Sequence, residues 1–458
     1  MKNDTIAAIS TAVSNAGLSI IRISGENSLD IIDKIFRSKA KNKKISDAVS
    51  HTVHYGYIYD GDLLIDEVMV LLMKGPKSYT KEDVIEIDCH GGIVVTKKIL
   101  ETVLKNGARL AEAGEFTKRA FLNGRIDLSQ AEAVMDIINS KNDLSLKNSL
   151  NQLKGNILDK IKIIRNNIMH DLAYIEVALD DPEHISLDNF SEELENNINN
   201  IIDDLNKLLK SSENGRLIKE GINTVILGKP NTGKSSLLNI LVGSDRAIVT
   251  DIAGTTRDTL EESINLGGLS LNIIDTAGIR ETDDAVEKIG VEKARKVARE
   301  ADLIIYMIDG SVKLDMNDEI IMNIIKDRKS VVLLNKTDLE VVVDAEEICD
   351  ILNKDIIQVS AKENKGIENL EKWIIDNYFQ GNIDFNDDIY ITNIRQKNAL
   401  TESIRSLENV LDSINNKMPE DFYSIDLMKA YEVLGEIIGE TVNEDLVDTI
   451  FSDFCMGK

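Results

Sequence analysis

One eight-residue stretch, Gly228–Ser235, constrains the fold of this chain more than any other. It reads GKPNTGKS, follows an apolar run at residues 222–227 and leads into a helical segment at 236–239. A strand, a glycine-rich loop and a helix in this order form a phosphate-binding loop, whose backbone N–H groups and helix N-terminus face the β- and γ-phosphates. Lys234 would bring positive charge to these phosphates, and the Ser235 hydroxyl would bind Mg²⁺.

Such a loop occurs by chance in long chains, so the other parts of a nucleotide site decide its meaning. Asp275 follows an apolar run at 269–274, where a carboxylate would meet Mg²⁺ and the Gly278 N–H would contact the γ-phosphate. Asp338 closes an Asn-Lys-Thr-Asp motif after the run 331–334 and can accept both N–H groups of a guanine edge, while it would repel adenine. The segment Ser360–Lys362, after the run 356–359, supplies a backbone N–H for the guanine O6. Four motifs in this order indicate a GTP-binding G protein.

The sequence therefore predicts a nucleotide site made from these four motifs and from the loop 250–256. Its expected members are Asn231, Thr232, Gly233, Lys234, Ser235, Ser236, Thr250, Asp251, Ile252, Ala253, Gly254, Thr255, Thr256, Asp275, Thr276, Ala277, Gly278, Asn335, Lys336, Thr337, Asp338, Ser360, Ala361 and Lys362.

Composition limits the class of protein. The chain has 458 residues, which suggests two to four domains, and 43% of them are hydrophobic, enough for real cores. No window of 18 uncharged apolar residues occurs and the N-terminus does not resemble a signal peptide, so we expect no membrane span. Three widely spaced cysteines predict no disulfide framework, and a cytoplasmic location is expected. The net charge of −26 argues against strong unaided binding to a nucleic-acid backbone.

The hydrophobic pattern predicts a multidomain α/β chain. Residues 1–118 are expected to form an α+β domain, with strands at 18–23 and 84–88 and helices at 29–36 and 93–106. Helices follow to residue 218, with an apolar stripe from Leu153 to Ile175 and a second amphipathic helix at 191–210. Residues 219–379 alternate strands and helices as a G domain does, and residues 380–458 return to helix, at 393–415, 425–438 and 444–451.

The two helical segments, 119–218 and 380–458, can be two halves of one domain or two independent bundles. The last segment holds few helices and would form a thin core by itself. We therefore favour a discontinuous helical domain into which the Ras-like G domain is inserted.

The residues that position the attacking water are less obvious. The position after the Asp275–Gly278 motif, which carries a water-orienting Gln in many small G proteins, is Ile279, so Arg280, Glu281 or Glu287 must be considered instead. Arg257 fits either a catalytic arginine in cis or a surface ion pair. The amide of Asn231, with backbone carbonyls from 250–255, can hold a monovalent cation beside the phosphates, or Asn231 can simply stabilise the loop.

The motifs resemble those of one family. The loop 228–236, the stretch Ile252–Asp258 and the C-terminal Phe454–Lys458, which reads FCMGK, are similar to the MnmE (TrmE) family of tRNA-modification GTPases. The resemblance extends to Arg22–Gly25 and to the stretch from Gly114 to Arg125 in the N-terminal part.

This resemblance implies roles for particular residues. Glu287 matches the family's catalytic glutamate, which orients the water through another water, and Cys455 is functionally required in the family and would lie near the folate pocket. Arg280 stays a separate catalytic candidate in the nucleotide site. Ser235 and Thr256 match the Mg²⁺ ligands, and K⁺ would be held by Asn231, Thr250, Ile252 and Thr255. A formyl- or methylene-tetrahydrofolate cofactor would contact Arg22, Glu86, Arg125 and Lys458, although some family members carry Lys at the position of Arg125.

The resemblance also implies a function and partners. The N-terminal domain would bind tetrahydrofolate and form a homodimer. With a partner of the MnmG (GidA) family, which carries FAD and uses NADH, the chain would act in a heterotetramer. GTP hydrolysis stimulated by K⁺ would then accompany addition of an aminomethyl or carboxymethylaminomethyl group at C5 of the wobble uridine of certain tRNAs.

Two other classes of protein remain open at this point. A ribosome-assembly G protein of the Era or EngA kind would carry a basic RNA-binding appendage, which this acidic chain with a helical C-terminus does not suggest. A purely regulatory switch would hydrolyse GTP slowly unless an activator is supplied.

Overall fold

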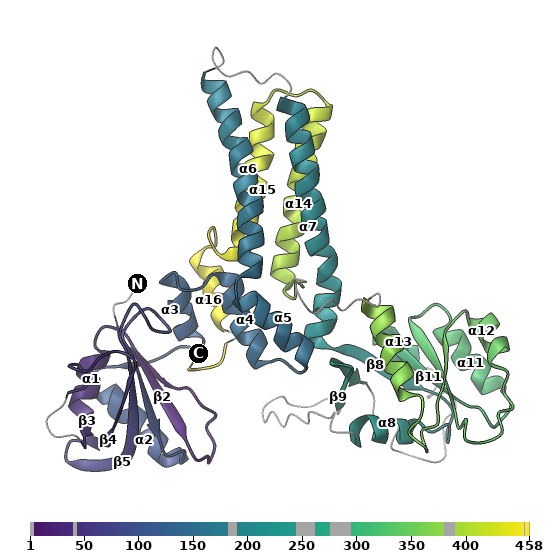
Figure 1. Cartoon of the computed structure of the whole chain (residues 1–458), viewed down its shortest axis with the longest axis horizontal. Coiled ribbons are helices and arrows are strands. Elements are labelled where there is room, and N and C mark those ends of the chain that lie inside the picture. The colour runs from purple at the N-terminus through teal and green to yellow at the C-terminus, as the bar shows by residue number, and fades with distance from the viewer. Residues whose placement is uncertain are drawn as a thin grey trace. The chain divides into compact units, whose positions relative to one another are not determined.

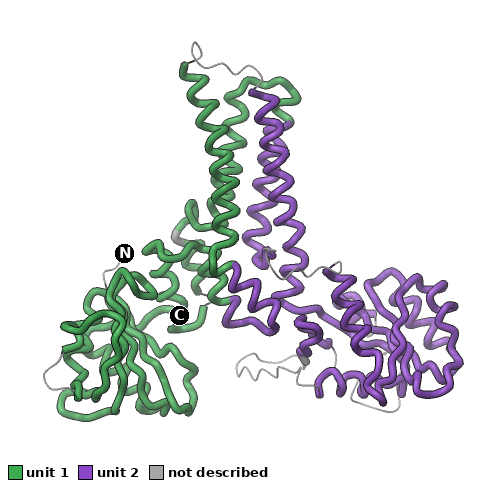
Figure 2. The backbone as a smooth tube through the Cα atoms, viewed as in Figure 1, with its two compact units in different colours: residues 1–135, 152–188, 412–458 green, residues 136–151, 189–411 purple. Residues whose placement is uncertain are grey.

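The computed structural model describes residues 4–39, 44–181, 190–243, 262–274, 295–379, 390–452 and 454–457 (Figure 1). The chain divides into two compact units. Unit 1 comprises residues 1–135, 152–188 and 412–458, and unit 2 comprises 136–151 and 189–411 (Figure 2). The fold is mixed α/β, with one large sheet in each unit, as the sequence predicts. The domain boundaries after residues 118, 218 and 379 do not coincide with the two units and stay predictions.

Unit 1 contains a seven-stranded sheet in the order β3-β4-β5-β6-β2-β1-β7. Its strands are β1 (Ile6–Ile9), β2 (Ser19–Ser24), β3 (Phe36–Ser38), β4 (Thr52–Asp60), β5 (Leu63–Met73), β6 (Val84–Cys89) and β7 (Arg109–Leu110), and helices α1 (Ser28–Ile35) and α2 (Ile93–Lys105) pack on it. The two strands and two helices expected here are confirmed.

Alternation along β2 and β6 gives this sheet two different faces. Ile21 and Ile23 on β2 and Ile85 and Ile87 on β6 are fully buried in the core with α1 and α2. Because successive side chains of a strand point to opposite faces, Arg22, between the two β2 isoleucines, lies on the other face. Arg22 is also paired with Glu86 in the register of β2 and β6. The N-terminal candidate site is built on that face.

The helices of unit 1 come from both ends of the chain. Besides α1 and α2, they include α3 (Glu115–Leu122), α4 (Leu128–Ile138, whose end lies in unit 2), α6 (Asn156–Asp180), α15 (Asp421–Ile438) and α16 (Glu444–Ser452). Helix α6 packs on α15, and α3 packs on α16. At the first contact Arg165 donates from Nε to the Tyr431 carbonyl at 3.1 Å, with its guanidinium 4.0 Å from the Tyr431 ring centroid. Helical segments before and after the nucleotide-binding segment thus pack together.

Unit 2 contains a six-stranded sheet in the order β13-β12-β11-β8-β10-β9. Its elements are β8 (Ile222–Leu227), α8 (Lys234–Gly243), β9 (Glu262–Leu266), β10 (Leu269–Ile273), β11 (Leu303–Asp309), α11 (Met316–Ile325), β12 (Ser330–Asn335), α12 (Ala345–Leu352), β13 (Ile356–Gln358) and α13 (Ile367–Phe379). All pairings are parallel except that of β9 with β10. The motif residues therefore follow the carboxyl ends of β8, β12 and β13, where open α/β sheets bind ligands.

The described part of unit 2 also contains the helices α5 (Asp143–Leu153, whose last residues lie in unit 1), α7 (Phe190–Glu220) and α14 (Ile394–Asn415, whose end also lies in unit 1). Helix α7 continues beyond its expected end at Lys210, because Leu217 and Ile218 extend its buried face to β8. Leu153 ends α5 instead of starting α6, since Gly155 interrupts the helix at a φ of 97°.

Within the described ranges, no helix combines the length and apolarity that a bilayer crossing requires.

Candidate functional site

The phosphate-binding loop occupies the connection between β8 and α8, as its sequence predicts. Three of its residues have a positive φ: Gly228 at 154°, Asn231 at 62° and Gly233 at 103°. A Cβ on Gly233 would lie 2.2 Å from the Asn335 Nδ2, and one on Gly228 would lie 2.5 Å from the Met307 carbonyl oxygen. Glycine is required at both positions, because backbone and neighbouring groups approach too closely for a side chain.

Lys234 is held inside this loop. Its ammonium donates hydrogen bonds to the carbonyls of Gly228 at 2.8 Å and Lys229 at 2.6 Å. Burial lowers the pKa of Lys234 to about 8. A desolvated ammonium is strongly attracted to any anion that enters the loop, so this geometry suits phosphate binding.

Asn335 joins the phosphate half of the site to the guanine half. This buried side chain donates from Nδ2 to the Thr232 carbonyl at 2.8 Å and accepts from the Ala361 N–H at Oδ1 at 2.9 Å. Three of the four predicted motifs therefore meet through one amide. Because both of its polar atoms are used, the loop after β13 cannot shift without disturbing the phosphate loop.

Asp338 stands at the position expected for guanine recognition. Its Oδ1 accepts a hydrogen bond from the Ser360 hydroxyl at 2.7 Å, and this bond lowers the pKa of Asp338. The carboxylate is thereby kept ionised and oriented. Thr337 donates to the Val359 carbonyl at 2.9 Å, which ties the same motif to the end of β13. Lys336, at a φ of 64°, pairs with Asp309 at 2.6 Å.

Several expected site residues lie outside the described residues. They are Glu287, Arg280, Thr250, Asp251, Ile252, Ala253, Gly254, Thr255, Thr256, Asp275, Thr276, Ala277, Gly278 and Lys458. Of the expected cation ligands, Asn231 and Ser235 are described, and both are exposed.

The second cluster of expected residues lies on the open face of the unit 1 sheet. Arg22 donates from Nε to Glu86 Oε1 at 2.8 Å and from Nη1 to the carbonyl of Gly457 at 3.2 Å. The Ser10 hydroxyl donates to the same carbonyl at 3.1 Å. Residues 435 positions apart are therefore in direct contact, and the C-terminal segment closes one side of this cluster.

Arg125 joins this cluster through an aromatic ring. Its guanidinium lies 4.5 Å from the centroid of the Tyr79 ring, and the Arg22 guanidinium lies 5.2 Å from the same centroid. Arg22 also lies 5.6 Å from the centroid of Phe116. Sequence reasoning missed Tyr79 as a site residue, since nothing in its local pattern separates it from a core tyrosine. Phe116 lies within the Gly114–Thr117 motif, so that motif could have identified it as a site residue.

Cys455 lies in the docked C-terminal segment. Its carbonyl accepts a hydrogen bond from the Gly114 N–H at 3.3 Å, while its side chain is exposed. The neighbouring Phe454 is buried against Phe451, with ring centroids 4.9 Å apart. The segment is thus fixed at both ends, at Phe454 and at Gly457, and Cys455 is presented between them.

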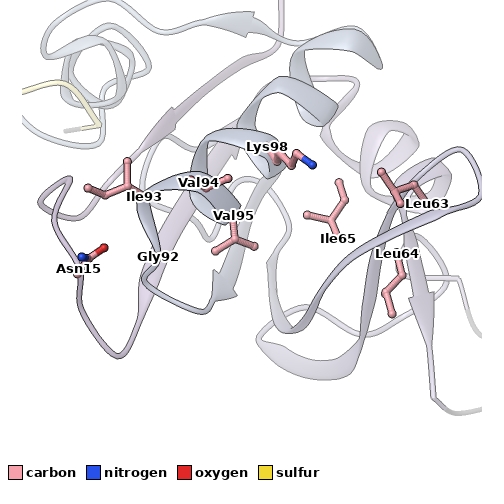
Figure 3. A pocket seen from close by; sticks show the side chains of 9 residues that line it. All are labelled: Asn15, Leu63, Leu64, Ile65, Gly92, Ile93, Val94, Val95 and Lys98. Carbon is pink, nitrogen blue, oxygen red and sulfur yellow. The ribbon is translucent and has the colours of Figure 1, made fainter.

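Two cavities lie in unit 1 away from these contacts. One, of about 730 Å³, is an apolar groove between β5 and the start of α2, lined by Asn15, Leu63, Leu64, Ile65, Gly92, Ile93, Val94, Val95 and Lys98 (Figure 3). The other, of about 660 Å³, contains an ionic cluster in which Arg109 and Arg119 pair with Asp4, Glu82 and Glu115. None of the predicted site residues lines either cavity.

Comparison with known proteins assigns the chain to a family. The sequence profile of the MnmE helical domain matches residues 128–455, and that of the GTP-binding protein TrmE N-terminus matches residues 5–125. The chain is 64% identical to the tRNA modification GTPase MnmE of Lachnoclostridium phytofermentans, over 100% of both chains. The chain belongs to the MnmE (TrmE) family.

Other MnmE relatives are similar over their full length. The tRNA modification GTPase MnmE of Acetivibrio thermocellus is 50% identical over 100% of both chains, and that of Alkaliphilus metalliredigens is 48% identical over 100% of this chain and 99% of the relative. The G domain of the FeoB iron transporter of T. maritima aligns with 35% of this chain and 99% of its own length, at 26% identity and a TM-score of 0.27.

Proposed function

We propose that this chain is a GTP hydrolase that acts in tRNA modification. The observation that carries the proposal is the amide of Asn335, which joins the phosphate loop at Thr232 to the guanine-recognition loop at Ala361 in one buried network. Around it, Lys234 is poised for phosphates and Asp338 for the guanine edge. Family membership adds the tRNA-modification context.

The described residues would bind GTP in a defined way. The Lys234 ammonium has three N–H donors, and two of them are bonded to the carbonyls of Gly228 and Lys229. The remaining donor would bond to a phosphate oxygen, a strong pairing because the acceptor is an anion. Asp338, oriented by Ser360, would accept the two guanine N–H groups. Glu287 is proposed to orient the attacking water, and Arg280 is a second proposed catalytic residue.

Two cations are expected to assist. Mg²⁺ would be held by Ser235 and Thr256, and K⁺ by Asn231, Thr250, Ile252 and Thr255. The described members fit such roles: Ser235 is an exposed residue in the first turn of α8, and Asn231 is exposed in the left-handed conformation that asparagine tolerates. When bound, these cations would neutralise charge that develops on the phosphates.

The cluster on the unit 1 sheet is proposed to bind a formyl- or methylene-tetrahydrofolate. Two guanidiniums around one tyrosine ring, with a carboxylate beside them, suit a ligand that combines an aromatic ring, N–H donors and carboxylates. Arg22, Glu86, Arg125 and Lys458 are the proposed contacts. The bound folate would supply the one-carbon unit, and Cys455 is proposed to act nearby in tRNA modification.

We further propose the assembly that family membership suggests. The chain would form a homodimer, operate in the cytoplasm and join an FAD- and NADH-using MnmG (GidA) partner in a heterotetramer. The G domain would be inserted in a discontinuous helical domain. The packing of α6 on α15 supports this arrangement, since these helices flank the nucleotide-binding segment in sequence. The product would be an aminomethyl or carboxymethylaminomethyl group at C5 of the wobble uridine.

The GTPase proposal is tested by GTP turnover of the purified full-length chain in K⁺ and in Na⁺. We expect faster turnover in K⁺ and near loss of turnover in Glu287→Ala, with GTP affinity changed by no more than a few-fold. Equal turnover rates in K⁺ and in Na⁺ would contradict the proposed potassium site. A wild-type rate in Glu287→Ala would assign the water to another group.

The tRNA proposal is tested by complementation of a bacterial strain that lacks wobble-uridine modification, read by mass spectrometry of tRNA nucleosides. Restoration of the modified uridine is expected from the wild-type chain. A chain that hydrolyses GTP and yet restores no modified uridine would favour the ribosome-assembly or regulatory alternatives.

A further inference from the structure

The second residue of the phosphate loop makes contacts that the four nucleotide motifs do not explain. The Lys229 ammonium lies 2.5 Å from Asp318 Oδ2 and 2.9 Å from Asp315 Oδ2. Both carboxylates belong to the start of α11, the helix that follows β11 in the chain. Lys229 is only 18% exposed and Asp318 only 1%. The pair with Asp318 is therefore largely desolvated, so its Coulomb attraction is stronger than in water, while Asp315 is 54% exposed.

Both carboxylate oxygens of Asp318 have hydrogen-bond partners. Its Oδ2 also accepts the Asp315 N–H at 3.0 Å, which completes a capping box at the start of α11. Its Oδ1 accepts a hydrogen bond from the hydroxyl of Tyr306, a fully buried side chain of β11, at 2.9 Å. Tyr306 thus fixes the carboxylate from the strand side. A carboxylate held in this way offers Lys229 a partner with little freedom to move.

The main chain of the same lysine faces the phosphate site. The Lys229 carbonyl accepts hydrogen bonds from the Thr232 hydroxyl at 2.9 Å and from the Lys234 ammonium at 2.6 Å. One residue therefore connects the buried carboxylate of α11 with the ammonium that would meet the phosphates. The capping box of α11 needs no lysine, since Asp315 and Asp318 already satisfy the N-terminal N–H groups between them.

We propose that Asp318 and Tyr306, two buried residues outside the nucleotide motifs, position the phosphate-binding loop through Lys229. They are positioning residues that hold the Lys229 carbonyl, and with it Lys234 and Thr232, in the arrangement that receives the nucleotide phosphates. This inference rests on the proposed GTP-binding function. It extends the site to the interior of β11 and to the first turn of α11.

The test measures the dissociation constants of GTP and GDP for the full-length chain by isothermal titration calorimetry. Lys229→Met removes the charge and keeps the approximate length of the side chain. It is expected to raise the dissociation constants of GTP and GDP by about tenfold. Lys229→Arg should stay within about threefold of the wild type, because a guanidinium can donate to both carboxylates. Lys313→Met removes an exposed lysine from the same β11–α11 connection and serves as the matched control, with no change expected.

A second variant keeps the test decisive if Lys229→Met does not fold. Tyr306→Phe alone should weaken the binding of both nucleotides by about threefold. Where Lys229→Met folds, the effect of Tyr306→Phe should vanish in that background, because Tyr306 acts only through Lys229. The turnover number at saturating GTP should change less than twofold, since a loop that binds the phosphates of substrate and transition state alike affects KM.

The outcomes separate two failures. If the wild type binds GTP, but Lys229→Met and Tyr306→Phe bind it equally well while their nucleotide-free melting temperature falls, the contacts only stabilise the fold and the inference is overturned. If the wild type binds neither GTP nor GDP, the proposed function itself fails, and this inference with it.

Discussion

Gly457 should control whether the C-terminal segment docks on the unit 1 sheet. Its φ is 87°, and a Cβ at this position would lie 2.4 Å from the Ile9 carbonyl oxygen and 2.8 Å from the Ser10 Cα. Both neighbours are main-chain atoms, so no side-chain rotation can relieve the contact. In Gly457→Ala the left-handed backbone adds about 1–2 kcal/mol to the energy of the docked state, before the steric contact is counted.

The opposing term is the free energy that holds the segment in place. The Gly457 carbonyl accepts hydrogen bonds from the Ser10 hydroxyl and from Arg22. A neutral hydrogen bond contributes about 1 kcal/mol and one from a charged donor about 2 kcal/mol, and the bond from the Gly114 N–H to the Cys455 carbonyl adds about 1 kcal/mol, so the three together stabilise docking by about 4 kcal/mol. The backbone term removes about a quarter to a half of this, and the contact with two main-chain atoms opposes the remainder. We expect residues 455–457 to be mainly undocked in the variant.

Hydrogen–deuterium exchange measures this directly. The Gly114 N–H, which donates to the Cys455 carbonyl, should exchange at least about tenfold faster in Gly457→Ala, since 1.4 kcal/mol corresponds to a factor of ten. Gly61→Ala is the matched control: Gly61 has a φ of 63° in the same unit, but no atom lies within 4 Å of its added Cβ. Unchanged exchange at Gly114 in Gly457→Ala would refute the reasoning. GTP affinity, which depends on residues of unit 2, should stay at the wild-type value.

Three further predictions concern single residues. Asp338→Asn should lower the affinity for GTP by about a hundredfold and raise the affinity for xanthosine triphosphate, because an amide can donate a hydrogen bond to the xanthine O2. Competition binding measures both affinities, and an unchanged preference for guanine would contradict the prediction. Asn142→Ala should lower the free energy of unfolding by about 2–3 kcal/mol in urea titration, since this buried amide donates to the Ile218 carbonyl and the Ser270 hydroxyl, each at 3.1 Å. Burial would raise the pKa of Glu115, but hydrogen bonds led by the one from Arg109 lower it overall, so stability should fall as the pH drops below about 4.3, the unfolded pKa. Arg109→Met should flatten that acid-side fall, measured by melting temperature against pH.

The described part of the candidate nucleotide site follows motifs that are local in the sequence. Each motif is a short run that follows an apolar strand, and the structure places the described ones at the carboxyl ends of β8, β12 and β13. The mixed α/β class followed from the change between period-two and helical patterns. Strands β4 and β5 were not foreseen, although Asp60-Gly61-Asp62 between them is a typical turn signal.

What the sequence could not reveal is which distant groups hold the motif residues in place. The contact of Arg22 with Gly457 joins the two ends of the chain, and no local pattern encodes such a pair. Tyr79 likewise entered the unit 1 cluster only through three-dimensional packing between two guanidiniums.

Asp318 shows why local patterns stop short of function. The run Asp315-Met316-Asn317-Asp318 before an apolar helix is a recognisable capping pattern, so a helix start at this place is predictable. The capping pattern explains the contact of only one Asp318 oxygen, and the same pattern occurs at many helix N-termini. The Tyr306 hydroxyl at the other oxygen and the Lys229 ammonium depend on β11 lying beside β8, which is a property of the sheet order. In the sequence, Asp318 therefore looks like an ordinary residue of a helix N-terminus. In the folded protein it also binds Lys229, the contact through which we propose that it positions the phosphate loop.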